Sequence, residues 1–202
     1  MAVLSSREAA VVAVMAAATA VTTMLIVIPF APTRGFFNVG DAMVMFSGLT
    51  FGARIGFLAG GIGSALADIL LGYGFFAPFT LFIKGMEGYV VGLIGRGRNL
   101  GYRVAGVVAG AAVMMLGYFM VEWAVLGFEV AIAELITVNS LQVTFGGIIS
   151  LALSGILAKA YPALQSFRYT PSHRREALAM GLTAIAVLAI VSFIYILLGV
   201  MG

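Results

Sequence analysis

The sequence predicts an all-α integral membrane protein, and three observations lead to this fold class. Apolar residues make up 62% of the 202-residue chain, charged residues only 9%, and the mean hydropathy is +1.14. About 20 apolar residues are needed for one helical span, so the chain has room for six or seven spans and no soluble domain. The basic residues, finally, cluster between the apolar segments, as they do in membrane proteins.

Seven apolar segments bounded by Gly, Pro or charged residues are predicted to be membrane helices. In chain order they are residues 8–30, 39–51, 53–72, 78–95, 103–125, 139–160 and 177–200. The first lacks a convincing cleavage site and is long enough to span, so we interpret it as a retained helix and not a signal peptide. The second is short for a bilayer at about 1.5 Å per residue, so we expect it to be tilted or shielded by its neighbours.

The third and fourth segments carry stripes of small residues. Glycine or serine recurs at every fourth position from Gly52 to Ser64 and leads to Asp68, and glycines recur between Gly85 and Gly95. Small residues let helix backbones approach closely, so both stripes predict packing seams.

The predicted segments divide the chain into three parts. Residues 1–162 are predicted to form a six-helix membrane domain, residues 163–176 a basic cytoplasmic connector, and residues 177–202 an additional C-terminal membrane helix.

The distribution of basic residues predicts the orientation. Lys and Arg concentrate on the cytoplasmic side of membrane proteins. With a cytoplasmic N-terminus and seven spans, nine of the eleven basic residues fall inside: Arg7, Arg54, Arg96, Arg98, Arg103, Lys159, Arg168, Arg174 and Arg175. We therefore expect a multi-pass protein of the cell membrane with its C-terminus outside.

Several function classes are excluded or disfavoured by composition. The formal charge of +3 reflects loops between spans, so topology explains it better than nucleic-acid binding does. The chain has no cysteine and one histidine, His173 in a basic loop, so we expect no metal or other cofactor. No nucleophile lies beside a base and no phosphate-binding or zinc-hydrolase motif is present, so an enzyme is not expected.

Four ionisable residues inside or beside apolar segments carry the strongest functional signal. Asp41, Asp68, Lys84 and Glu87 are predicted to converge on the outer half of the bundle. A charge in the bilayer costs about 2.5 to 3.5 kcal/mol on insertion scales, so such groups pair with one another or form a ligand site. Lys84 and Glu87 are three residues apart and could satisfy each other while only orienting helices.

Further candidates lie at the same predicted level. Three amide side chains are candidates: Asn38, Asn139 and Gln142. They could bind a ligand, or they could equally form hydrogen bonds between helices. Five aromatic residues are also candidates: Phe36, Phe37, Tyr73, Phe75 and Trp123. They are predicted either to form a lid and stacking surface for a flat ring or to belong to an aromatic belt at the bilayer interface.

The run from Gly35 to Gly95, with FFNVGDAMVMF, GGIGSALADILLGYGFFAPF and TLFIKGMEGYVVGLIGR, resembles the S components of energy-coupling factor (ECF) vitamin transporters, most closely the riboflavin-transporter-like branch. The resemblance covers about residues 8–162. It implies a six-helix protein that binds a water-soluble vitamin near the outer face, under the loop joining helices one and two. It also implies a membrane coupling subunit and two cytoplasmic ATPases as partners, and a contact with the coupling subunit through Ala9, Ala13 and Ala17. Residues 177–200 have no counterpart in those six helices.

The charge of the predicted site restricts the ligand. Three carboxylates face one lysine, and a buried acidic excess is costly without a cation or several donors. We therefore expect a neutral or weakly cationic, donor-rich aromatic compound, such as riboflavin or a pyridoxine-like or aminopyrimidine precursor. Two alternatives remain open at this point: a small membrane assembly subunit without a ligand, and a self-sufficient secondary transporter that uses the carboxylates as proton relays.

Overall fold

A computed structural model describes residues 4–30, 35–97 and 99–161, and their regular secondary structure is helical apart from two three-residue strands. The predicted connector 163–176 and last helix 177–200 lie outside the described residues. The elements are α1 Ser6–Leu25, β1 Ile28–Phe30, β2 Gly35–Phe37, α2 Asp41–Phe51, α3 Ala53–Leu70, α4 Ala77–Gly95, α5 Leu100–Leu126, α6 Phe128–Glu134, the π-helical turn η1 Leu135–Asn139 and α7 Ser140–Ala160.

Local sequence signals explain where several helices begin. Ser5 and Glu8 form a capping box at the start of α1, in which each side chain accepts a hydrogen bond from the backbone N–H of the other residue. At the start of α5, the side chain of Asn99 accepts the backbone N–H of Tyr102 at 3.2 Å. Gly52 and Gly127 have φ angles of 97° and 95°, which favour glycine, and they separate α2 from α3 and α5 from α6.

Among the described residues, five helices are long and apolar enough to cross a membrane. They are α1, α3, α4, α5 and the continuous helix Phe128–Ala160, which comprises α6, η1 and α7. The eleven residues of α2 are too few for a span, but α2 packs against α1, α3, α4, α5 and α7. Most of its side chains are buried. The prediction that this short helix is shielded by its neighbours is confirmed.

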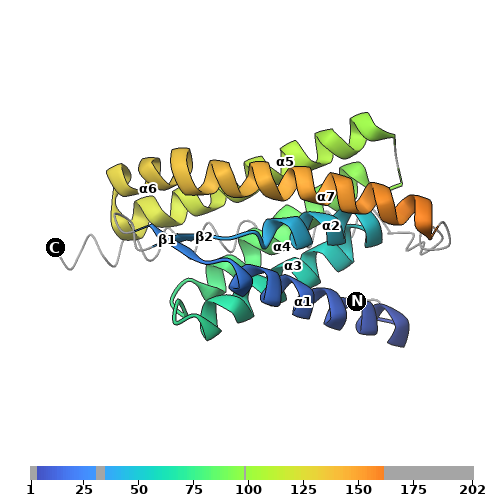
Figure 1. Ribbon diagram of the computed structural model, residues 1–202. Coiled ribbons are helices and arrows are strands. Elements are labelled where there is room, and N and C mark those ends of the chain that lie inside the picture. Colours follow the sequence, from blue (N-terminus) through green and yellow to red (C-terminus); the bar gives the residue numbers. More distant parts are fainter. Residues whose placement is uncertain (1–3, 31–34, 98, 162–202) are drawn as a thin grey trace.

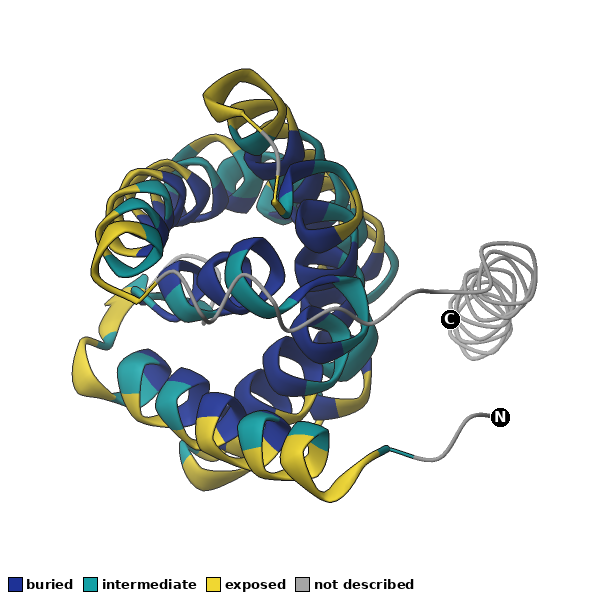
Figure 2. Cartoon of the chain, turned by 90° about the vertical axis from the view of Figure 1, so that its right-hand side faces the viewer, coloured by how far each residue is buried: buried dark blue, intermediate teal, exposed yellow. Residues whose placement is uncertain are grey.

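The helices turn their buried faces toward one another and their exposed faces outward (Figure 2). Large apolar side chains dominate the outer surface, among them Val14, Val108 and Ile148, each more than 60% exposed. In a water-soluble protein such a surface would promote aggregation, whereas in a bilayer it faces lipid chains of the same polarity. The described part of the fold thus has the surface of a membrane helix bundle.

Close backbone contacts hold α3 against α4 and α2, as the small-residue stripes predict. A Cβ atom at Gly56 of α3 would meet the carbonyl oxygen of Gly88 in α4, and a Cβ atom at Gly88 would meet that of Gly56. A Cβ atom at Gly48 of α2 would also meet the Gly88 oxygen. Only glycine permits these three backbones to approach so closely, so the stripes are packing seams.

Two predicted boundaries were wrong. Helix one was expected to continue to residue 30, but α1 ends at Leu25 and the chain continues as β1, which pairs antiparallel with β2. The sixth helix was expected to begin at residue 139, but it begins at Phe128, directly after Gly127. The sequence FEVAIAEL there has several good helix formers, yet it lies between the predicted spans 103–125 and 139–160.

The two ends of the bundle differ in charge. The N-terminus of α1, the connection from α4 to α5 and the C-terminus of α7 lie at one end, and β1, β2 and α6 lie at the other (Figure 1). Basic residues mark the first end: Arg7 in the first turn of α1, Arg96 after α4, Arg103 near the start of α5 and Lys159 in the last turn of α7. We call these the basic end and the ribbon end.

Candidate ligand-binding site

A pocket with a cavity volume of about 90 Å³ lies at the ribbon end of the bundle. Residues of β2, α3, α4, α5, α6, η1 and α7 line it together with three residues between elements: Gly35, Phe36, Asn38, Asp68, Tyr73, Phe76, Thr80, Lys84, Tyr118, Glu122, Leu126, Glu134, Val138, Asn139 and Gln142. The combination of aromatic rings with a few buried polar groups is typical of small-molecule sites.

The floor of the pocket is built around Lys84 of α4. Its amino group forms an ion pair with Asp41 at the start of α2, and it lies 3.3 Å from Oε2 of Glu87. The same amino group lies 5.6 Å from the centre of the Tyr118 ring, within reach of a cation–π interaction. The charge of Lys84 is therefore balanced by Asp41 and Glu87, and Lys84 adds no free positive charge to the pocket.

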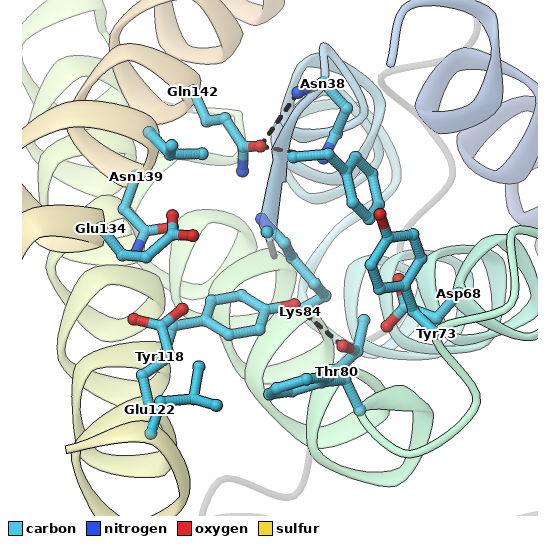
Figure 3. A pocket seen from close by; sticks show the side chains of 15 residues that line it. Asn38, Asp68, Tyr73, Thr80, Lys84, Tyr118, Glu122, Glu134, Asn139 and Gln142 are labelled. Carbon is cyan, nitrogen blue, oxygen red and sulfur yellow. Dashed lines mark hydrogen bonds between the residues drawn. The ribbon is translucent and has the colours of Figure 1, made fainter. Parts of the chain in front are cut away.

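Asp68 and Tyr73 mark one side of the pocket, and Glu122, Glu134 and Asn139 mark the opposite side, with Lys84 between them (Figure 3). Asp68 is 7% exposed and Glu122 8% exposed. Because the charge of Lys84 is already balanced by its two carboxylate partners, the walls present three carboxyl groups whose oxygens can accept hydrogen bonds. Such a site favours a ligand with positive charge or several N–H or O–H donors.

The segment after β2 is fastened to α7 by Gln142. Oε1 of Gln142 accepts hydrogen bonds from the backbone N–H of Asn38 at 3.0 Å and from its side-chain amide at 2.9 Å. The Asn38 side chain in turn accepts the N–H of Gly40 at 2.9 Å. These bonds position β2 and the start of α2 over the pocket, so both amides hold the backbone as well as line the site.

Aromatic residues cover the Asp68 side. The rings of Phe36 on β2 and Tyr73 after α3 lie 4.7 Å apart with an interplanar angle of 43°. Below them, the hydroxyl of Tyr118 donates to Oγ1 of Thr80 at 3.0 Å. These rings offer flat apolar surfaces beside buried carboxylates, an arrangement that suits an aromatic ring bearing polar substituents.

The structure brings together most, though not all, of the sequence-predicted site. The residues that line the pocket are Asn38, Asp68, Lys84, Asn139, Gln142, Phe36 and Tyr73. Asp41 and Glu87 do not line it, because both carboxylates point at Lys84 from beneath and are fully buried. Lys84 and Glu87 do form the ion pair that their spacing allows, and Asp41 is a second partner of the same lysine.

Three predicted aromatic residues lie outside the pocket. Adjacent strand residues point to opposite faces, so Phe37 faces away from Phe36 and packs edge-on against Phe145 of α7, 6.0 Å between centres. Phe75 and Trp123 are 59% and 50% exposed, on the outer surface. Their positions agree with the alternative of an aromatic belt at the bilayer interface.

Sequence reasoning missed Glu122, Glu134, Tyr118 and Thr80. Neither glutamate is among the predicted site residues: Glu122 lies near the end of the predicted span 103–125, and Glu134 lies between that span and the next. The rule that singled out Asp68, a carboxylate in an apolar segment, would have selected Glu122 as well. Glu134 could not be selected in that way, because it lies between the predicted spans 103–125 and 139–160.

The alanine stripe of α1 lies on the outer surface. Ala9, Ala13 and Ala17 are all exposed, whereas Ala16 and Ala20 are buried. The backbone at Ala16 lies against Gly63 of α3, so the face of α1 that carries Ala16 and Ala20 makes the contacts within the bundle. The stripe of three alanines is thus not used for packing against any described part of the chain.

Comparison with known proteins gives a consistent family. The family model for the S component of the ECF-type riboflavin transporter matches residues 3–159. An uncharacterised protein from the gap 3′ region of Pyrococcus woesei is 44% identical over 143 residues, which are 70% of this chain and 95% of the relative. The thiamine precursor transporter HmpT of Lactococcus lactis subsp. cremoris is 28% identical over 154 residues, 76% of this chain and 89% of the relative.

These matches and the five apolar helices show a multi-pass protein of the cell membrane, and the family is one of transporter subunits and not of enzymes. The match covers more than three quarters of the chain and includes every residue of the pocket. The chain therefore belongs to the family of ECF-type riboflavin transporter S components, vitamin-type substrate-binding subunits of membrane transporters.

Proposed function

We propose that this protein captures a water-soluble vitamin or vitamin precursor at the outer face of the cell membrane, in the pocket at the ribbon end. The observation that carries the proposal is the pocket itself, in which buried carboxylates and amides surround aromatic rings beneath β2. A collapsed pocket would instead support a ligand-free assembly subunit. Within the described residues, the wall carboxylates Asp68 and Glu122 have no cation as close as those of the Lys84 ion pairs.

The orientation that we propose is supported by the charge difference between the two ends of the bundle. Basic residues favour the cytoplasmic side, and the described ones gather at the basic end. We therefore infer that the N-terminus lies inside and that the pocket opens at the outer face. A ligand would enter from outside between β2 and the loop after α3, which carry Phe36 and Tyr73.

The ligand we propose is a flat, neutral or cationic, donor-rich ring compound. The acidic walls and the neutralised Lys84 disfavour anionic vitamins. Two ligand types fit: riboflavin, after which the family is named, and a pyridoxine-like or aminopyrimidine precursor. The relative from Lactococcus lactis, which transports a thiamine precursor, supports the second type.

The partners we propose are an ECF membrane coupling subunit and two cytoplasmic ATPases that drive uptake, as family membership implies. The exposed stripe of Ala9, Ala13 and Ala17 on α1 offers a smooth helical face for the coupling subunit. Helices that present small residues can approach a partner helix closely in a membrane.

The test is ligand-dependent thermal stability of the purified full-length chain in detergent, with a panel of vitamins and precursors. A ligand at 100 times its dissociation constant adds about 2.7 kcal/mol to stability. We expect one ring compound to stabilise the wild type, and Asp68→Asn to weaken that effect. Glu129→Gln is the matched control, because Glu129 is an exposed carboxylate of α6 outside the pocket. No stabilisation by any compound would favour the assembly-subunit alternative.

A further inference from the structure

Thr80 of α4 uses its hydroxyl group differently from most threonines of the bundle. The hydroxyl of a threonine within a helix commonly donates to the backbone carbonyl four residues earlier. Five of the described threonines make this bond, over 2.6 to 2.8 Å: Thr19, Thr22, Thr23, Thr137 and Thr144. Thr80 is 2% exposed, and its hydroxyl oxygen instead contacts a side chain of another helix. Its hydroxyl therefore connects helices at the pocket.

The hydrogen bonds of Thr80 run in one direction. The hydroxyl of Tyr118 donates to Oγ1 of Thr80 at 3.0 Å (Figure 3). Because Tyr118 supplies the hydrogen of that bond, Thr80 keeps its own hydroxyl hydrogen for another acceptor. The carboxyl group of Asp68 lies within hydrogen-bonding reach of the Thr80 side chain. Tyr118 therefore donates to Thr80 and Thr80 donates to Asp68, an arrangement that we call the Tyr118–Thr80–Asp68 chain.

This chain joins three helices at the pocket. Asp68 lies near the end of α3, Thr80 in the first turn of α4 and Tyr118 on α5, and all three line the pocket. Asp68 is 7% exposed, so its carboxyl group would be costly to bury without a partner. A side chain that a hydrogen bond already holds loses little further freedom when a ligand binds. The chain thus fixes the shape of the pocket before the ligand arrives.

We propose that Thr80 is a positioning residue of this pocket and acts through Asp68 and Tyr118. Its hydroxyl holds the Asp68 carboxyl group, whose remaining lone pairs accept a hydrogen bond from a donor group of the ligand. Thr80 also accepts the hydroxyl hydrogen of Tyr118, so Tyr118 presents its ring to the ligand and not a donor. This inference rests on the proposed function and assigns a role to a residue that sequence reasoning missed.

Two other roles for Thr80 give different results. A threonine that contacts the ligand directly contributes independently of Tyr118, so the losses in affinity from removing both hydroxyl groups multiply. A threonine that only holds α4 against its neighbours affects the stability of the protein and not its affinity for a ligand. In the Tyr118–Thr80–Asp68 chain, by contrast, removal of either hydroxyl group disturbs the same carboxyl group, so the two losses do not multiply.

The test is isothermal titration of the purified full-length chain. The probes are riboflavin, the alcohol of the pyrimidine half of thiamine, and any compound that stabilises the wild type in the vitamin panel. Thr80→Val keeps the shape of the side chain without its hydroxyl, and it should weaken binding of each probe that the wild type binds roughly tenfold, as expected for a lost hydrogen bond to a carboxylate. Thr80→Ser keeps the hydroxyl and should bind within roughly threefold of the wild type. Thr144→Val is the matched control, because Thr144 is exposed and its hydroxyl donates to Ser140 of its own helix.

A second pair of variants separates the chain from direct ligand contacts. Tyr118→Phe removes the donor to Thr80 but keeps the ring, and it should weaken binding of the same probe by a smaller factor than Thr80→Val. The double variant Thr80→Val/Tyr118→Phe should bind no more weakly than Thr80→Val alone. Thermal unfolding of every variant checks that it is folded.

The outcomes separate this inference from the proposed function. Wild-type affinity in Thr80→Val, equal weakening by Thr80→Ser and Thr80→Val, or losses that multiply in the double variant overturns the inference and leaves the proposed function standing. If Thr80→Val does not fold, Tyr118→Phe decides: binding as tight as that of the wild type overturns the inference, and weaker binding supports it. If the wild type binds no compound at all, the proposed function fails and the positioning role of Thr80 fails with it.

Discussion

Lys84 on α4 and Asp41 at the start of α2 form an ion pair beneath the pocket, with Glu87 3.3 Å from the same amino group. All three side chains are at most 5% exposed. Two buried carboxylates thus share the positive charge of one lysine, and the three side chains together support the floor of the pocket. This cluster links α2 to α4 and separates the bundle interior from the ligand site.

Replacing Lys84 should therefore destabilise the protein. Lys84→Met keeps the length of the side chain but leaves Asp41 and Glu87 buried without a cation, and breaking a buried pair costs about 3–5 kcal/mol. Unfolding of the full-length chain in detergent should show this loss, whereas Lys159→Met, at an exposed position of α7, should change stability little. Equal stability of the two variants would mean that the pair contributes nothing to the floor.

The contact between α3 and α4 should tolerate no side chain at Gly56. Gly56→Ala would place a methyl group against the backbone of Gly88, and overpacking of this kind costs about 1–3 kcal/mol. Gly155→Ala on α7 is the matched control, because nothing lies within 4 Å of a Cβ atom there. Thermal unfolding of both variants measures the difference, and a neutral Gly56→Ala would contradict the close contact.

The bonds from Asn38 to Gln142 should control how firmly β2 covers the pocket. Gln142→Leu removes the acceptor of two hydrogen bonds, so bound ligand should dissociate roughly tenfold faster. Gln142→Glu keeps an acceptor oxygen and should remain closer to wild type. Stopped-flow dissociation measures both rates. If Gln142→Leu released ligand at the wild-type rate, these bonds would not hold the cover.

The exposed alanine stripe of α1 should matter for transport and not for ligand binding. Ala13→Trp adds bulk to the stripe and should abolish uptake in cells that contain the coupling subunit and ATPases, with ligand affinity of the purified chain unchanged. Val108→Trp, at a 62% exposed position of α5, is the control and should transport normally. Normal uptake by Ala13→Trp would remove the stripe from the partner surface.

Much of the bundle could be predicted from the sequence because membrane helices are constrained by length and polarity. The apolar lengths predict α3, α4 and α5 to within a few residues and the start of α1, and the cost of charge in a bilayer singled out Asp68 and Lys84. The glycine stripe of α3 predicted a seam because only small residues permit close backbone contact.

Other parts could not be predicted because they depend on tertiary contacts. The strands β1 and β2 have three residues each, which is too short for an alternating pattern to identify them as strands. The π-helical turn at Leu135–Asn139 has no local sequence signature, yet it decides that Glu134 and Asn139 share a wall. Asp41 and Glu87 were correctly predicted near Lys84, but only the packing of α2 under α4 shows that they face away from the pocket.

Native mass spectrometry of the full-length chain, purified gently in detergent, tests the central claim most directly. The pocket predicts a co-purified ring compound of vitamin size in one-to-one ratio, and Asp68→Asn should lose it while Glu129→Gln retains it. Identification of that compound would name the ligand in the same experiment. A wild-type protein that carries no compound, and that gains no mass with any vitamin or precursor added in excess, would contradict a ligand-binding role for this pocket.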